Sequence, residues 1–374
     1  MTNRNRRRSI GLMLSAAVVV GLPATARAHD NDKLLVIKTQ GSFMVGGTVI
    51  SAPGTFDPTA FPPPPDGQTL HGDHAYVQYQ VPQTPRKYPL VMWHGAGQFS
   101  KTWESTPDGR EGYQSIFLRR DFTTYIIDQP RRGRAGSSTV GTTLTPTPFD
   151  QFWFTLFRVG VWPNYFAGVQ FPRDAKSLDQ YLRQITPDTG PNEIEIGARA
   201  VSALFDKIGE GVLITHSDSG SRGWVTAMKN RNVRGIVSYE PVLFAFPQGE
   251  LPPPRGFPQL SVSQAEFEKL AKIPIQLVYG DNIPSGPSPI WGLQFWVDVL
   301  ANAREFVAAV NRHGGNAELL MLPEIGVRGN THFPFSDLNN LKIADLLSKY
   351  LQRKKLDRYP SKRGDDHHDH WASR

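Results

Sequence analysis

The stretch Gly211-Val212-Leu213-Ile214-Thr215-His216-Ser217-Asp218-Ser219-Gly220 joins an apolar run to a serine and a series of small residues. The helical pattern Trp224-Val225-Thr226-Ala227-Met228 follows it. A strand that turns sharply into a helix around a serine is a nucleophile elbow, in which small neighbours let the hydroxyl project above a sheet. Thr215 and Ser219 stand where the usual G-x-S-x-G pattern has glycines. The stretch therefore predicts Ser217 as a nucleophile, with a serine that only caps the helix as the alternative.

Short apolar runs alternate with longer helical patterns on both sides of this turn. Continuous apolar runs are typical of strands buried on both faces of a parallel sheet, and we expect such strands at residues 90–93, 124–127, 212–214, 235–239, 275–279 and 318–322. Helical patterns occupy residues 112–120, 219–230, 293–313 and 337–351, the last with Ser336 as its expected N-cap. This alternation predicts an α/β core with a doubly wound sheet over residues 88–350.

Residues 29–87 precede this core and predict an antiparallel β meander joined to it. β-branched runs at 34–40 and 43–50 are separated by Gly41-Ser42, and 75–81 alternates as a third strand.

An insertion at about residues 143–190 interrupts the alternation. Within it, Phe149 to Phe171 holds nine aromatic residues in 23, against 11% for the whole chain. Because open α/β sheets bind ligands at the carboxyl ends of their strands, we expect this segment to form a cap over an apolar pocket there. The alternative is a helix packed into the core. Residues 251–259, with three consecutive prolines, predict a second loop at the rim.

A glycine turn follows the first core strand, in Trp93-His94-Gly95-Ala96-Gly97-Gln98. Glycines let the backbone turn N–H groups toward a substrate, and hydrolases that transfer acyl groups place half of an oxyanion hole at this point. We expect Ala96 to supply the first N–H donor, with Gly97 as the alternative. The second donor belongs to the residue after the nucleophile, Asp218.

The general base is expected to be a histidine, and elimination among the ten histidines of the chain leaves His332. It stands in Gly329-Asn330-Thr331-His332-Phe333-Pro334, after the last strand and before the last helix, which agrees with the chain order Ser, acid, His. Two carboxylates could hold its ring: Asp281 ends the strand at 275–279, and Glu240 ends the strand directly after the elbow helix. Strand position alone leans slightly to Asp281, and both stay open on this reasoning.

The chain resembles the α/β-hydrolases and, among them, exported bacterial carboxylesterases of the "esterase 713" type. The resemblance spans about residues 41–335 and is carried by 41–47, the turn at His94, 102–112, Asp128-Gln129-Pro130, Gly133-Arg134, His216-Ser217, Tyr239-Glu240-Pro241 and 329–332. It implies an α/β-hydrolase fold and ester hydrolysis. That group takes its acid from the strand after the elbow helix, which ranks Glu240 above Asp281. Thr215 departs from the glycine expected there.

The reaction that these residues predict is acyl transfer in two halves. His332 takes the proton of Ser217, whose oxygen attacks an ester carbonyl, and water later releases the acyl-enzyme. We expect no metal and no organic cofactor. The substrate is expected to be a small ester with an apolar part. A lactonase, an amidase or a polyester hydrolase could use the same triad, and a catalytically silent binding protein of this fold is the alternative from another class.

The first residues and the net charge of the chain indicate where the protein acts and which partners it lacks. The first 28 residues hold a basic run, an apolar stretch from Ile10 to Leu22 and the cleavage pattern Ala26-Arg27-Ala28, which together predict a signal peptide. We expect a periplasmic or secreted protein, exported by the Sec route, with the twin-arginine route left open. Five of the seven net positive charges lie in this leader, so a nucleic-acid partner is not expected.

The cysteine content and the C-terminal tail bear on thiol and metal chemistry. The chain has no cysteine, which excludes thiol chemistry. No membrane attachment is expected after the leader is removed, and a homodimer is left open. Residues 351–374 predict a polar, disordered tail whose His and Asp residues bind metals only adventitiously.

Overall fold

The computed structural model describes residues 34–361, and those from Leu35 onward belong to one compact unit. The predicted signal peptide and the His/Asp cluster of the tail lie outside the described residues. None of the helices within 34–361 is long and apolar enough to cross a bilayer.

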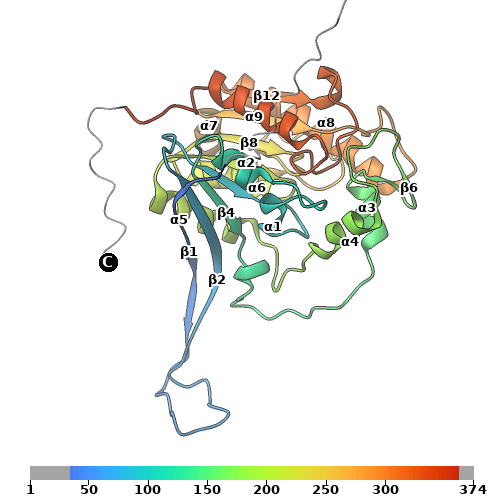
Figure 1. Cartoon of the computed structure of the whole chain (residues 1–374). Helices are drawn as coiled ribbons and strands as arrows, with labels where there is room; N and C mark the ends of the chain where they lie inside the picture. The colour runs from blue at the N-terminus through green and yellow to red at the C-terminus, as the bar shows by residue number, and fades with distance from the viewer. Residues whose placement is uncertain (1–33, 362–374) are drawn as a thin grey trace, which may run out of the picture. The chain divides into compact units, whose positions relative to one another are not determined.

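An eight-stranded sheet in the order β1-β2-β4-β3-β7-β8-β11-β12 forms the centre of the fold (Figure 1). β1 pairs with β2 and β2 with β4 in antiparallel fashion, and every later neighbour pair is parallel. This confirms the predicted α/β-hydrolase sheet, and each core strand lies close to its predicted position. The strands are β1 (Ile37–Ser51), β2 (Thr69–Pro82), β3 (Leu90–Trp93), β4 (Thr124–Asp128), β7 (Gly211–His216), β8 (Val233–Tyr239), β11 (Pro274–Tyr279) and β12 (Asn316–Met321).

Helices cover both faces of the sheet, because each core strand is apolar on both sides. In β3, Val91 and Trp93 pack on one face while Leu90 and Met92 pack on the other. The first face is covered by α5 (Ile194–Ile208), α6 (Ser219–Lys229), α7 (Gln264–Ala271) and α8 (Trp291–Arg312), and the second by α2 (Tyr113–Leu118) and α9 (Asn340–Arg353). Shorter elements outside the insertion are α1 (Lys101–Glu104), η2 (Gly133–Ala135), β9 (Ala245–Pro247), β10 (Leu260–Val262) and η3 (Leu322–Ile325).

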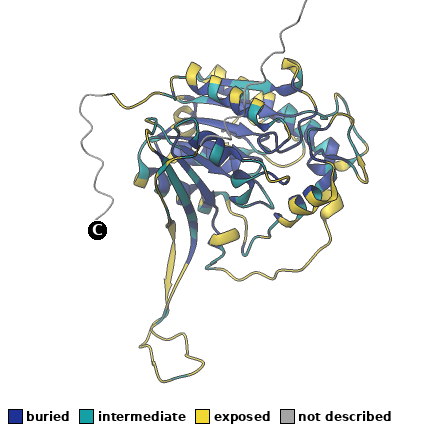
Figure 2. Ribbon diagram, in the orientation of Figure 1, coloured by how far each residue is buried: buried dark blue, intermediate teal, exposed yellow. Residues whose placement is uncertain are grey.

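The N-terminal region differs from the predicted meander of three strands. Residues 34–40 and 43–50 are not separate strands but parts of the single strand β1, because Gly41 and Ser42 stay paired with Tyr79 and Gln78. β1 and β2 form one long hairpin, and its far end and connecting loop are exposed (Figure 2).

The last helix also begins later than predicted. Its N-cap is Asn339 rather than Ser336, because the N–H groups of Ser336 and Asp337 both donate to the Phe333 carbonyl in a turn that precedes the helix. Helices α1, α5 and α7 were not predicted, and neither was α4 (Ala175–Arg183).

The insertion between β4 and β7 contains α3 (Asp150–Leu156), the short strands β5 (Gly160–Val161) and β6 (Asn164–Tyr165), and α4 (Ala175–Arg183). Packing into the core, the alternative, holds for some of its aromatic residues, and the apolar pocket beneath the segment stays a prediction. Phe154 and Phe157 are buried in the core, whereas Phe149 and Trp162 are exposed. The segment is therefore fixed to the body by some of its rings and presents others to solvent.

Candidate active site

Ser217 occupies the sharp turn between β7 and α6. Its φ of +56° lies in the left-handed region, which costs a non-glycine residue energy and is common where a site needs a strained backbone. Its N–H donates to the Tyr239 carbonyl at 2.8 Å, so the end of β8 holds the turn. A methyl group at Gly95 would lie 2.7 Å from the Ser217 Cβ. The glycine turn after β3 therefore packs directly against the serine.

Thr215 and Ser219, which replace the expected glycines, are accommodated by their neighbours. The Thr215 hydroxyl donates to Ser238 Oγ at 2.7 Å, and a methyl group at Gly223 would lie 2.8 Å from Thr215 Cγ2. The Thr215 side chain therefore occupies space that is open only because residue 223 on α6 is a glycine. Ser219 Oγ accepts from the His216 N–H and lies 3.0 Å from the Trp93 carbonyl, which ties the ends of β7 and β3 together.

Two buried side chains fix the peptide between Gly95 and Ala96. The Gly95 carbonyl accepts from Arg132 Nη1 at 2.9 Å and lies 3.0 Å from His94 Nδ1. His94 Nε2 accepts the Gln129 N–H, so Nδ1 carries the proton, and burial together with nearby Arg132 lowers the His94 pKa to about 4. The carbonyl and the next N–H of a trans peptide point in opposite directions, so this contact turns the Ala96 N–H away from Arg132. Among the described residues, that N–H has no acceptor.

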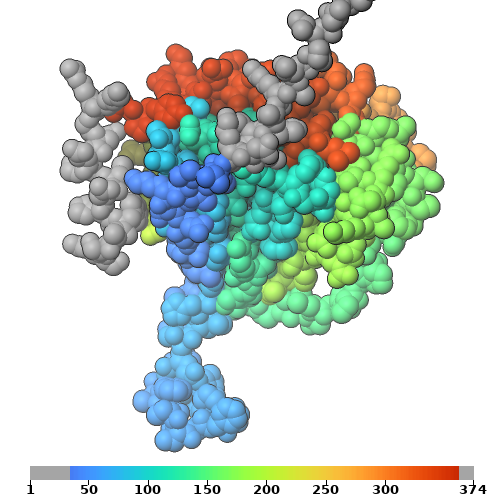
Figure 3. Space-filling model, viewed as in Figure 1, coloured from blue at the N-terminus to red at the C-terminus, as the bar shows by residue number. Residues whose placement is uncertain are grey.

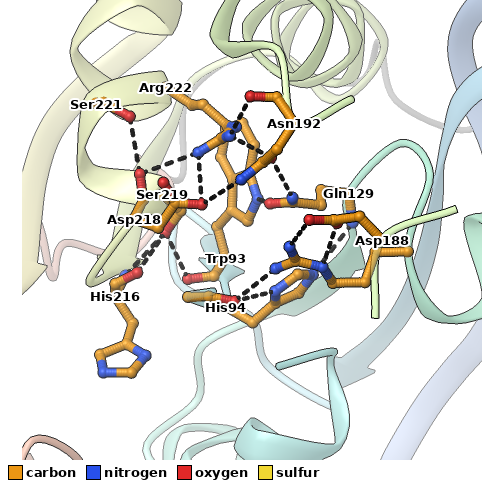
Figure 4. Close-up of polar contacts among 12 residues, drawn as sticks. Trp93, His94, Gln129, Asp188, Asn192, His216, Asp218, Ser219, Ser221 and Arg222 are labelled. Carbon is orange, nitrogen blue, oxygen red and sulfur yellow. Dashed lines mark hydrogen bonds and ion pairs between the residues drawn. The ribbon is translucent and has the colours of Figure 1, made fainter. Parts of the chain in front are cut away.

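Asp218 keeps its side chain turned away from its own N–H. The carboxylate lies 2.9 Å from Arg222 Nη1 and accepts from Asn192 at 3.1 Å (Figure 4). Burial opposes its ionisation, but the Arg222 and Arg132 charges hold the Asp218 pKa below its usual value. Within residues 34–361 its backbone N–H also has no acceptor. Both predicted oxyanion donors are thus unpaired.

His332 and Glu240 meet in the interior. Nδ1 of His332 lies 3.4 Å from Glu240 Oε2, and both side chains are buried. Glu240 has a φ of +54°, so it too sits in a strained turn, at the end of β8. The His332 ring stacks on Phe157 with centroids 5.0 Å apart and lies 4.6 Å from the Trp296 ring. His216 packs beneath it at 4.5 Å.

Arg158 is a site residue that sequence reasoning missed. Its guanidinium is fully buried, donates from Nη2 to Glu240 Oε1 at 2.6 Å and from Nε to the Asp281 carbonyl at 2.9 Å, and lies over the Trp296 ring. Burial lowers the pKa of His332 well below its usual value, and the Arg158 charge lowers it further. A signal was present in the sequence: Arg158 is the sole charged residue of 151–172, and a charge in so apolar a segment needs a buried partner.

Asp281, the alternative acid, is occupied elsewhere. One carboxylate oxygen accepts the N–H of Asn282 and the other accepts the N–H of Gly329, each at 2.8 Å. Asp281 therefore holds the start of the loop that carries His332.

Asp337 holds the end of that loop. It accepts from the N–H of Thr331, the Thr331 hydroxyl and the Asn330 amide. Burial raises the Asp337 pKa to about 7 although these donors oppose the shift.

The Ser217 hydroxyl has no hydrogen-bond partner among the described residues. Its neighbour His216 contacts the His332 ring, which places the turn next to that histidine. Hydrogen bonds of a catalytic serine are often long in the absence of substrate and shorten when it binds. A methyl group at Gly97 would lie 3.7 Å from the Trp153 ring, so this ring lies next to the glycine turn. The described residues contain no group of three His, Asp or Glu side chains that could hold a metal ion.

Comparisons with known proteins place the chain in a family. No family model matches the chain. A probable secreted lipase, phiG, of a fungal species (strain ATCC 74256) is 30% identical over 321 residues, which cover 74% of this chain and 85% of that protein. A solved structure of a novel bacterial esterase is also 30% identical, with a TM-score of 0.70 over 86% of this chain and 98% of that one. The chain belongs to the α/β-hydrolases. A peroxisomal alpha-beta-hydrolase of Saccharomyces cerevisiae is more distant from this hydrolase, at 12% identity and a TM-score of 0.43 over 88% of this chain and 92% of that one.

Proposed function

We propose that this α/β-hydrolase is a serine carboxylesterase in which Ser217 is the nucleophile, His332 the base and Glu240 the acid. Relatives that share 30% of its residues are named an esterase and a lipase, and the chain is accordingly a hydrolase of carboxylic esters. The observation that carries the residue assignment is the buried contact between His332 Nδ1 and Glu240 Oε2 beside the strained turn at Ser217.

The geometry supports an acyl-enzyme mechanism. With Nδ1 directed at Glu240, Nε2 of His332 is free to take the Ser217 proton as the oxygen attacks the ester carbonyl. Because burial and Arg158 lower the His332 pKa, the ring is neutral and ready to act as a base at neutral pH. Glu240 then stabilises the imidazolium that forms, and the N–H groups of Ala96 and Asp218 stabilise the oxyanion. The imidazolium gives this proton to the departing alcohol, which leaves the acyl group on Ser217. His332 then takes a proton from the water that attacks the acyl-enzyme and returns it to Ser217 as the carboxylic acid is released.

The substrate expected from the walls of the site is an ester with an apolar part. Trp153 lies beside the glycine turn, and Phe157 stacks on both Trp153 and His332. Aromatic walls gain free energy by burying alkyl or aryl groups, at about 25 cal/mol per Å² of apolar surface. We further propose that the chain acts after export, in keeping with its leader pattern and with a relative that is named a secreted lipase.

The test is hydrolysis of a p-nitrophenyl ester series from acetate to decanoate by the purified protein beside Ser217→Ala. We expect activity in the parent and a loss of about 10⁴-fold or more in the variant. A fluorophosphonate label should attach to Ser217 of the parent and not to Ser217→Ala. Activity that persists in the variant would exclude the assigned nucleophile. Activity on lactones or amides alone would exclude a carboxylesterase but retain the triad.

A further inference from the structure

The insertion and α8 share an exposed aromatic surface. The rings of Phe149, Phe152, Trp291, Phe295 and Phe257 contact one another in that order, with centroids 5.8, 5.7, 5.6 and 5.7 Å apart. The exposed fractions of Phe149, Trp291 and Phe257 are 52%, 56% and 52%. We call these five residues the aromatic ridge. Contiguous exposed rings of this kind mark binding surfaces, because their contact with water is unfavourable.

Two stretches of chain that carry four of the ridge residues have few charges. Between residues 135 and 172 the charged residues are Asp150 and the buried Arg158, and residues 282–297 contain none, in a chain that is 20% charged. In Figure 3 the insertion, in green, lies beside the orange region that contains α8. Asp298 is the nearest charge on α8; it lines the ridge beside Phe295 and accepts a hydrogen bond from Gln294, so the surface around the ridge is sparsely charged as well as aromatic. Protein partners are normally oriented by complementary charges, and an anionic bilayer would need cations, so this surface suits an uncharged apolar phase.

The ridge continues inward to the candidate active site. Phe152 contacts Trp153 with centroids 5.5 Å apart, Trp153 stacks on Phe157 at 4.8 Å, and Phe157 stacks on His332 at 5.0 Å. An unbroken series of rings thus leads from the exposed surface to the base. A protein partner or a second copy of the chain seated on the ridge would cover the outer end of this route.

We propose that the aromatic ridge binds the surface of an undissolved, uncharged ester, from which substrate molecules pass along Trp153 and Phe157 to Ser217. This inference rests on the proposed function and narrows its substrate class to water-insoluble esters. A groove of about 180 Å³ between Phe257, Trp291 and Phe295 gives one alkyl chain a place on the ridge.

Adsorption is measured first, without turnover. Ser217→Ala protein is mixed with a tributyrin emulsion, the oil is separated by centrifugation, and the bound fraction is determined. The ridge variant adds Phe149→Ser and Trp291→Ser, and the matched control adds Phe56→Ser and Phe61→Ser, which remove two exposed rings from the β1–β2 loop. We expect the partition constant to fall about tenfold in the ridge variant, since it loses apolar contact area, and to stay unchanged in the control. Equal adsorption by all three proteins would overturn the proposal.

Turnover is measured second, with Ser217 intact. The rate of the parent on tributyrin should rise steeply once the ester exceeds its solubility. The ridge variant should lose that rise yet keep its rate on dissolved tributyrin within about twofold, since exposed substitutions rarely disturb a distant site. A variant that loses both rates equally would contradict the proposal. A ridge variant that adsorbs normally but changes from dimer to monomer would also contradict the proposal, because the ridge would then contact a second copy of the chain.

The two proposals fail in distinguishable ways. If the parent hydrolyses dissolved esters through Ser217 but does not adsorb to the emulsion, the ridge proposal is wrong and the proposed function stands. If Ser217 is neither labelled nor required for hydrolysis, the proposed function is wrong whatever the adsorption result.

Discussion

The turn at Ser217 and the pair His332–Glu240 belong to one candidate site but are positioned by different means. Ser217 is held by the backbone hydrogen bond from its N–H to the Tyr239 carbonyl and by close contact with Gly95 of the glycine turn. His332 and Glu240 are held by large side chains from the insertion, namely the Phe157 ring and the Arg158 guanidinium. The proposed nucleophile therefore depends on the backbone and on a small residue at the ends of strands, whereas the proposed base and acid depend on large side chains of the insertion.

The first prediction distinguishes the two candidate acids, Glu240 and Asp281, and has the largest expected effect. Glu240→Ala should lower kcat/KM by about 10³–10⁴-fold, because His332 loses the carboxylate that orients it. Asp281→Ala should lower it by less than about tenfold, because that carboxylate binds only backbone N–H groups of the loop. Steady-state kinetics on one soluble ester measure both. Comparable losses in the two variants would show that the acid was assigned wrongly.

The second prediction concerns close packing at the turn. Gly95→Ala would place a methyl group 2.7 Å from Ser217 Cβ and 2.9 Å from His216 Nδ1. The glycine turn must then shift, and we expect kcat to fall about 10²-fold, as when one oxyanion donor is lost. Gly141→Ala is the control, because a methyl group there meets nothing within 4 Å. Unchanged kcat in Gly95→Ala would mean that the turn is not held by this contact.

The third prediction tests the insertion through pH. Arg158→Met removes a buried positive charge that lowers the His332 pKa, so that pKa should rise. The base is then protonated up to a higher pH, and the acid limb of kcat/KM against pH should move upward, with the largest loss of kcat/KM below neutral pH. Arg158→Lys keeps the charge and should keep the limb near its original position.

Stability of this variant is measured alongside, since breaking a buried ion pair costs about 3–5 kcal/mol. The pH profile is therefore recorded at a temperature where circular dichroism shows folded protein. An acid limb that stays in place in folded Arg158→Met would show that Arg158 acts only on stability.

The fourth prediction has the smallest effect and concerns Thr215. Thr215→Val removes the hydroxyl that donates to Ser238 and leaves that buried oxygen without its partner. The free energy of unfolding should fall by about 1 kcal/mol, while kcat/KM changes by less than about twofold. Urea unfolding measures the first quantity, with Thr143→Val, at an exposed position, as the control. A large loss of activity without loss of stability would give Thr215 a role in the elbow itself.

The sequence alone determined the parts of the protein whose contacts are local. Short continuous apolar runs predicted the core strands, because a strand buried on both faces needs little beyond its own residues to be recognised. The serine between β7 and α6 and the glycine turn after β3 were found in the same way, since a sharp turn restricts residue types at fixed positions. The histidine followed from chain order.

Only the tertiary structure decided which groups meet across the sheet. Glu240 and Asp281 end strands that pair with each other, and the sequence could not tell which carboxylate faces His332, because that depends on how each turn is bent after its strand. Arg158 became part of the site through a packed segment whose position no local pattern specifies. Side chains brought together from distant segments are fixed by the packing of the whole core, and that packing is the information a single sequence does not display.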